Sequence, residues 1–331
     1  MNRRTFLTGS MAMATLAPTV GAAALDVDIP QSPIMRMFEM LPGDPGTDGF
    51  DFPVTSGANG HIQRSVWPEN PDMYWDPEGE DYDTIFGIYP TWMNLSGTQD
   101  GVSLWKMKMS AFDRDVSQTT LESNGWKIVD DDLRILRYGG SEDERSALAG
   151  SLNILGSWMR QGDWDWVALP DDSSLVVGSD EDRVRIVADR VKNHTAMATV
   201  DERFHQLGNI LRTDSYLVSL LPPQRLPVDL AEASFVSRSW TGDEPIIHSI
   251  GLRLESGDQV LSMIDSVQER LETQISTVVS KVYADFLKIA DIANYRGTVR
   301  FDLIDTSGNW DIFRALGADD LGMLPLLDGN D

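Results

Sequence analysis

From residue 101 onward, short strand-like segments alternate with amphipathic helical segments, and this alternation restricts the fold more than any other feature of the sequence. Alternating apolar residues predict a strand over Ser103–Phe112, and Asp113 or Asp115 is suited to cap a helix that continues through Glu122. Turn residues between apolar runs predict two hairpins, Trp126–Val129 with Leu133–Tyr138 and Trp164–Leu169 with Ser174–Val177. This region is therefore expected to form a folded core of strands and helices.

The rest of the region continues the alternation. Ser179 is expected to cap a helix in which Val184, Val187 and Val191 form one apolar stripe. The segment Ile275–Ala293 fits a helix and a strand equally well. The remaining predictions are helices at Val200–Leu211, Asp258–Glu272 and Trp310–Leu316, and strands at Ser215–Leu221, Ile246–Leu254 and Thr298–Ile304.

The strand–helix unit at residues 103–124 has a counterpart at residues 246–272. This repetition predicts an α+β fold with two similar halves, residues 101–230 and 231–331. Each half is expected to be an antiparallel sheet with helices on one face, as in ferredoxin-like units.

Residues 25–100 are rich in proline and glycine and are expected to be largely irregular, with short helices at Ile34–Leu41 and Tyr82–Met93, the second broken near Pro90. The aromatic side chains of this segment are candidate binding residues, because rings on a loop-rich surface stack on sugars or hold a partner protein. Alternatively, the rings cover the sheet. The candidates are Trp67, Tyr74, Trp75, Tyr82 and Trp92.

The charge of the chain restricts its partners. The sequence has 52 Asp and Glu against 27 Lys and Arg, a net charge of −25, which repels nucleic acids and anionic membranes. Asp and Arg predominate over Glu and Lys, a bias that fits either a saline habitat or a high-GC genome. The absence of cysteine excludes disulfides, thiolate metal sites and cysteine nucleophiles.

The sequence offers no recognisable catalytic motif. It contains no Gly-x-Ser-x-Gly, phosphate-binding loop or His-Glu-x-x-His pattern, and its four histidines are far apart. The acidic clusters, such as residues 76–83 and Asp130–Asp132, lack the ligand spacing of a calcium loop. No cofactor is therefore expected, with weak calcium binding as the remaining alternative.

Residues 1–24 carry the most specific motif. Arg3 and Arg4 lead directly into Phe6 and Leu7, and a weakly apolar stretch ends in small residues before Leu25. This resembles the twin-arginine export signal, although Thr8 stands where the family often has lysine. The resemblance implies passage through the twin-arginine translocase as a folded protein, cleavage after Ala23 or Ala24, and an extracytoplasmic location. After cleavage, no later segment is long and apolar enough to be expected as a membrane span.

A second resemblance covers residues 101–316. The matching residues are Asn124-Gly125-Trp126 and Leu175–Ser179, and their order is similar to that in uncharacterised exported proteins of high-GC bacteria. That group has no assigned activity, so the resemblance implies a fold and no chemistry.

Three functions agree with these observations. The leading hypothesis is a non-enzymatic exported protein that binds a small ligand or a cell-envelope partner. The second is an extracytoplasmic hydrolase that uses acidic residues, with or without the assistance of calcium. The third is a structural component of the cell envelope.

Overall fold

The fold is α+β, and its strands are all antiparallel to their neighbours in the part of the chain that the structure describes. In this computed structural model, the described residues are 33–41, 55–59, 80–89, 92–99, 101–152, 155–195, 202–221, 231–239, 245–276 and 279–307. The expected export signal, Trp67, Tyr74, Trp75 and the expected helix at Trp310–Leu316 lie outside these ranges.

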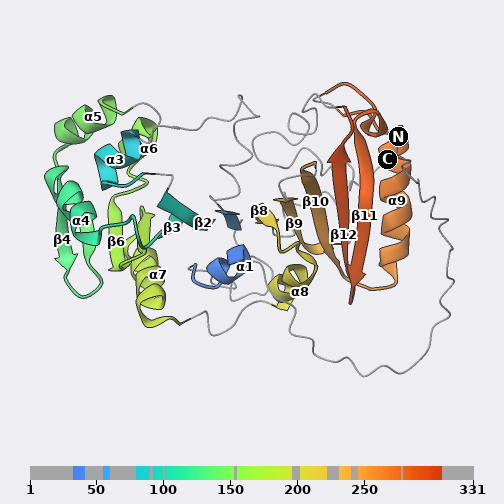
Figure 1. The fold of residues 1–331 in the computed structure, drawn as a ribbon, viewed down its shortest axis with the longest axis horizontal. Helices are drawn as coiled ribbons and strands as arrows, with labels where there is room; N and C mark the ends of the chain where they lie inside the picture. Colours follow the sequence, from blue (N-terminus) through green and yellow to red (C-terminus); the bar gives the residue numbers. More distant parts are fainter. Residues whose placement is uncertain are drawn as a thin grey trace, which may run out of the picture. The chain divides into compact units, whose positions relative to one another are not determined.

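The strands pair in the order β11-β12-β10-β9-β8-β1-β2-β3-β7-β6-β5-β4, so β1 stands between a run of five strands and a run of six (Figure 1). The boundary expected between residues 230 and 231 stays a prediction, and β8 before it pairs with β9 after it. The strands are β1 (Thr55–Asn59), β2 (Met93–Gln99), β3 (Val102–Met107), β4 (Trp126–Asp130), β5 (Ile135–Tyr138), β6 (Trp166–Asp171), β7 (Ser174–Gly178), β8 (Ser215–Leu221), β9 (Ala231–Ser239), β10 (Ile247–Leu254), β11 (Leu287–Tyr295) and β12 (Thr298–Asp305).

The helices follow from local capping and turn residues. Asp113 caps α4 by accepting hydrogen bonds from the backbone of Asp115 and Val116. Asp180, one residue after the expected Ser179, caps α7 by accepting from Arg183 N. The helices are α1 (Pro33–Phe38), α3 (Glu80–Phe86), α4 (Arg114–Ser123), α5 (Glu142–Gly150), α6 (Gly156–Gln161), α7 (Glu181–Asn193), α8 (Glu202–Ile210) and α9 (Gln259–Thr273).

Helices cover both faces of the six-stranded run, so the expectation of helices on one face is wrong. The neighbouring residues Val176 and Val177 of β7 point to opposite faces. Val176 belongs to the apolar cluster of α7, and Val177 belongs to the cluster that contains Leu121 of α4. The physical reason is that every residue of β7 is buried, so both faces need apolar cover.

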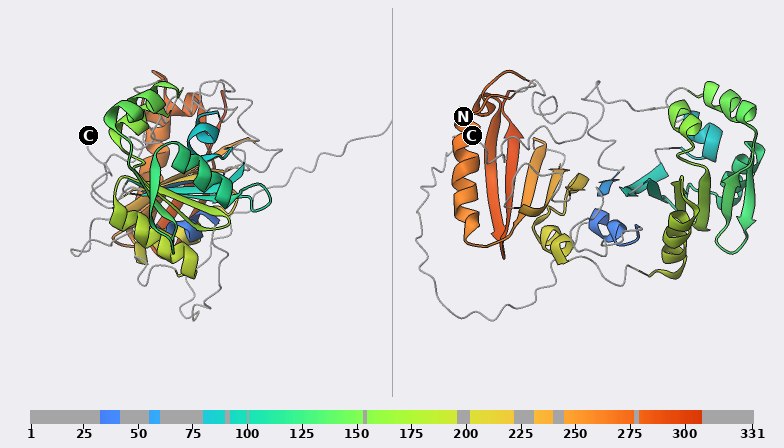
Figure 2. Two further views of the ribbon diagram at one scale, coloured as in Figure 1. Left: turned by 90° about the vertical axis from the view of Figure 1, so that its left-hand side faces the viewer. Right: turned by 180° about the vertical axis from the view of Figure 1, so that it is seen from behind.

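The five-stranded run is also covered on both faces. Ile250 and Leu252 of β10 pack with Val267 of α9, which runs beside β11 and β12 (Figures 1 and 2). On the other face, Phe235 of β9 belongs to the cluster that contains residues of α8. Gly251 lies opposite Phe235 in the β9–β10 pair and leaves room for its ring.

Several expected boundaries are wrong. β3 ends at Met107 instead of Phe112, because a turn at residues 108–111 closes it. The segment Tyr82–Met93 is divided between α3 and the start of β2, and the helix ends before Gly87, whose φ of 64° suits glycine. In the ambiguous segment Ile275–Ala293, Ile275 forms an isolated β-bridge with Val282. A 3₁₀ turn follows at Tyr283–Asp285, and the rest of the segment contributes most of β11.

Both outermost strands of the sheet contain a β-bulge. In β4 the pairing with β5 shifts between Ile128 and Asp130, and in β11 the pairing with β12 shifts between Ile289 and Asp291. The extra residues are Val129 and Ala290, and an aspartate, Asp130 or Asp291, directly follows each bulge. Within the described ranges, no helix is both long and apolar enough to cross a membrane.

Candidate functional site

An aromatic pair lies in the connection between α3 and β2. Trp92 N donates a hydrogen bond to Tyr89 O at 2.8 Å, which joins the backbones of the two residues. Their ring centroids are 5.0 Å apart with planes at 65°, an edge-to-face contact. Tyr89 is 38% exposed and Trp92 is half-buried, so part of the pair faces water.

The hydroxyl of Tyr89 is held by a neighbouring carboxylate. It donates to Asp83 Oδ2 at 3.0 Å, and Asp83 lies on an exposed position of α3. This hydrogen bond, together with the negative charge of Asp83, raises the pKa of Tyr89 above its ordinary value. The phenol is therefore protonated at neutral pH, and the carboxylate keeps further lone pairs for other donors.

A β-bulge lies directly beside the aromatic pair. Met93 pairs with Met107 and Leu95 pairs with Lys106, so Asn94 between them has no partner on β3 and is exposed. Lys108 N donates to Trp92 O at 2.7 Å, and the next residue, Met109, is 73% exposed. Asp83, Tyr89 and Trp92 are joined by contacts, and Asn94 and Met109 are exposed residues two positions along the chain from Trp92 and Met107. These five residues are called the Tyr89–Trp92 surface below.

The structure separates the predicted aromatic candidates. Tyr82 is half-buried and contacts Trp105 edge-to-face at 5.5 Å, and it also contacts Phe86, so it packs against the core of the six-stranded run. Trp92 is also half-buried and packs against the same core, and its contact with Tyr89 places it at the border of the Tyr89–Trp92 surface. Trp67, Tyr74 and Trp75 lie outside the described residues, and their binding role stays a prediction. Asn94 and Met109 were not predicted, because the bulge leaves no signal in the apolar pattern.

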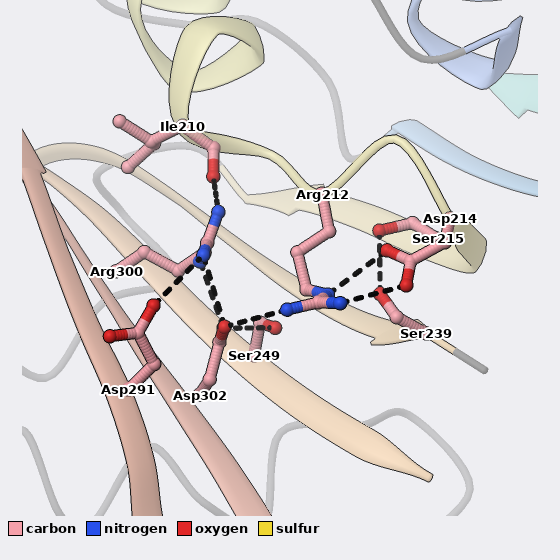
Figure 3. Close-up of polar contacts among 9 residues, drawn as sticks. All are labelled: Ile210, Arg212, Asp214, Ser215, Ser239, Ser249, Asp291, Arg300 and Asp302. Atoms are coloured by element: carbon pink, nitrogen blue, oxygen red, sulfur yellow. Dashed lines mark hydrogen bonds and ion pairs between the residues drawn. The ribbon is translucent and has the colours of Figure 1, made fainter. Parts of the chain in front are cut away.

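A second polar cluster lies on the five-stranded run, next to the end of α8 (Figure 3). Asp302 of β12 is buried, and its carboxylate accepts hydrogen bonds from Ser249 Oγ at 2.7 Å and Arg212 Nη1 at 3.2 Å. Arg300 Nε lies 2.8 Å from the same carboxylate, and Arg300 also donates to the carbonyl of Ile210 at the end of α8. The cluster therefore joins α8 to β12.

The register of β11 against β12 explains why Arg212 and Arg300 both lie beside Asp302. Asp291 of β11 lies directly opposite Asp302, and like charges in such a pair destabilise a sheet. Arg300 Nη2 lies 3.8 Å from Asp291 and also donates to Asp302, so its charge offsets both. Arg212 forms two further hydrogen bonds with Asp214, which are the main cause of its raised pKa. The carboxylates are thus already engaged by cations.

A third group combines a hydroxyl, an amine and a carboxylate. Lys106 Nζ donates to Ser174 Oγ at 2.5 Å and lies 3.4 Å from Asp171 Oδ2. Burial alone would raise the pKa of Asp171, but hydrogen bonding from Ser174 and the charge of Lys106 lower it overall. Serine–lysine pairs serve as nucleophiles in some hydrolases. Here Ser174 is completely buried, so its position in this structure gives no access to a substrate.

The histidines do not form a metal site in the described residues. His248 is buried on β10, and its pKa lies well below the ordinary value because burial disfavours the imidazolium and Arg238 adds to this effect. His194 is exposed and ends α7 in the left-handed conformation. Within the described ranges, no group of three or more His, Cys, Asp or Glu side chains is placed to hold a metal ion.

No protein-family model, curated protein or solved structure matches this sequence. The functional argument therefore depends on the geometry of the described residues. Of the three groups, the Tyr89–Trp92 surface combines exposed apolar area with polar groups, while the other two polar groups are engaged in contacts within the chain.

Proposed function

We propose that this chain is an exported, non-enzymatic protein that binds a ligand or partner of the cell envelope through the Tyr89–Trp92 surface. The edge-to-face pair of the exposed Tyr89 and the half-buried Trp92 carries the proposal. Tyrosine, tryptophan and methionine are enriched where proteins bind partners, and the two aromatic side chains supply large contact areas at low entropic cost. The predicted candidates Trp67, Tyr74 and Trp75 belong to the same proposal on the grounds of the sequence alone.

The binding test uses protein lacking residues 1–24 and insoluble envelope material isolated from the host. The wild-type protein is expected to co-sediment with this material, and Trp92→Ala and Tyr89→Ala are each expected to weaken retention. Tyr295→Ala is the matched control, because Tyr295 is a half-buried tyrosine on the outermost strand β11. The proposal fails if the wild-type protein does not sediment, or if both variants sediment as well as the wild type.

Two further measurements on the same protein separate the alternatives. Turnover of a glycan, ester or phosphate substrate by the wild-type protein would favour the hydrolase. Self-association without any ligand would favour a structural envelope component.

Export is part of the proposal, and it is supported by the resemblance of Arg3, Arg4, Phe6 and Leu7 to the twin-arginine motif. Replacing both arginines by lysine keeps the charge but removes the guanidinium groups. The variant is expected to accumulate as a precursor in the cytoplasm, measured by fractionation and immunoblotting. Normal processing would refute twin-arginine export.

We also propose that the two halves share a strand–helix–strand unit. In β3–α4–β4 and in β10–α9–β11, the helix connects an inner strand to the outermost strand of its run. Three strands lie between β3 and β4, and β12 alone lies between β10 and β11. We further propose that residues 25–100 are irregular outside α1, β1, α3 and β2.

A further inference from the structure

We infer that the ligand class of the Tyr89–Trp92 surface is a neutral saccharide, an inference that rests on the proposed function. Tyr89 and Trp92 supply aromatic planes, and Asp83 and Asn94 supply polar groups beside them. A sugar ring presents the same combination, with apolar C–H faces and hydroxyls around its edge.

The polar groups match the hydrogen-bonding needs of sugar hydroxyls. Each hydroxyl donates one hydrogen bond and accepts others. The Asn94 side chain offers both a donor and an acceptor, and the bulge in β2 leaves it exposed. Asp83 already accepts the Tyr89 hydroxyl at 3.0 Å, which fixes the phenol and leaves acceptor sites on the carboxylate for a sugar.

Charge argues against anionic ligands. The net charge of −25 repels anionic polymers such as nucleic acids. Among the described residues, the surface offers two aromatic rings and two polar side chains, which is the scale of a site for one or two sugar units.

The direct test is saturation-transfer NMR on protein lacking residues 1–24, with chitotetraose, cellotetraose and maltotetraose as probes. At least one probe is expected to receive saturation at its ring C–H protons. Trp92→Ala is expected to weaken that binding about tenfold, which corresponds to about 1.4 kcal/mol. Asn94→Ala is expected to weaken it severalfold, and Trp92→Phe, which keeps a ring, is expected to retain most of it.

The matched control is Asn193→Ala, which removes an exposed amide at the end of α7 and should leave sugar binding unchanged. Thermal melts of every variant establish that it is folded. Sugar binding that survives both Trp92→Ala and Asn94→Ala would overturn the inference.

The two proposals fail in different ways. If Trp92→Ala abolishes envelope binding but no tetrasaccharide binds the wild type, the saccharide inference is wrong and the proposed function stands. Displacement of the envelope-bound protein by tetralysine, but not by any tetrasaccharide, likewise overturns the saccharide inference and identifies a cationic ligand. If the wild-type protein binds neither envelope material nor tetrasaccharides, both proposals are wrong.

Discussion

Asp302 shows how strongly a single residue depends on its surroundings. A carboxylate that is removed from water must be compensated by opposite charge or hydrogen bonds. Asp302 is 1% exposed and has two arginines and a serine around it, whereas the side chain of its cross-strand neighbour Asp291 is 64% exposed. The two aspartates share Arg300 but differ in solvent access, so they form a matched pair for mutation.

We expect Asp302→Asn to lower the free energy of unfolding by about 3 kcal/mol, because it removes the buried carboxylate charge that the part-buried guanidinium groups of Arg212 and Arg300 share. Asp291→Asn should change it by about 0.5 kcal/mol or less, as is usual for exposed positions. Urea denaturation monitored by tryptophan fluorescence measures both. Equal effects of the two substitutions would show that the buried network does not stabilise the fold in this way.

Gly251 is a second position with a strong effect on packing, because its missing Cβ leaves room for the ring of Phe235. A Cβ added there would lie 2.1 Å from the ring of Phe235, far inside contact distance. We expect Gly251→Ala to destabilise the protein by about 1–3 kcal/mol.

Gly150 provides the control, because a Cβ there meets nothing within 4 Å and the residue ends α5. Gly150→Ala should be neutral or stabilising by up to about 1 kcal/mol, since alanine favours a helix. Denaturation midpoints of the two variants should therefore shift in opposite directions or differ clearly in size.

At the scale of elements, α5 is fixed by a capping box. Ser141 Oγ accepts from Glu144 N, and Glu144 Oε2 accepts from Ser141 N at 2.7 Å. The hydrogen bonds from the backbone and hydroxyl of Ser141 lower the pKa of Glu144. Its contribution to stability is therefore present above the pKa of the unfolded chain and is lost as the pH falls through the folded value.

NMR titration should find the pKa of Glu144 below its value in an unfolded peptide, about 4.3. Ser141→Ala removes the hydroxyl and should raise the pKa of Glu144 toward that value, because one of the two hydrogen bonds is gone. Glu142, in the same helical turn but outside the capping box, serves as the internal reference. An unchanged titration of Glu144 in the variant would mean that the cap is not formed in solution.

Elements with strong apolar periodicity or clear turns were predictable from the sequence, such as α4, α9 and the β6–β7 hairpin. β9 was not predicted, because one of its faces carries Ser237 and Ser239 and the other carries Arg238, all of them buried. A pattern that equates burial with apolar residues overlooks such a strand. The Arg212–Asp302 contact joins residues 90 positions apart and belongs to no motif, so only the fold brings it together.

At the scale of the molecule, electrostatic repulsion dominates the response to salt. Without residues 1–24, 25 basic residues remain against 52 acidic ones, a net charge of 25 − 52 = −27. Repulsion at this charge opposes compaction, and salt screens it over about 10 Å at 0.1 M and about 3 Å at 1 M.

We therefore expect Tm to rise with NaCl up to about 1 M, measured by calorimetry. Calcium should raise Tm at lower concentration than NaCl if an acidic loop binds it, and otherwise only as ionic strength requires. A flat or falling Tm would mean that local caps and ion pairs already neutralise the acidic residues, and would remove the support for adaptation to salt.

The bulges in β4 and β11 determine what happens at the two ends of the sheet. An open strand edge is a template onto which another chain can add, and repeated addition produces fibrils. At each end, an incoming strand would meet a break in register, beside Asp130 in β4 or Asp291 in β11. Asp291 also presents an exposed carboxylate there, whereas Asp130 is paired with Arg185. We therefore expect both ends of the sheet to resist the addition of further strands.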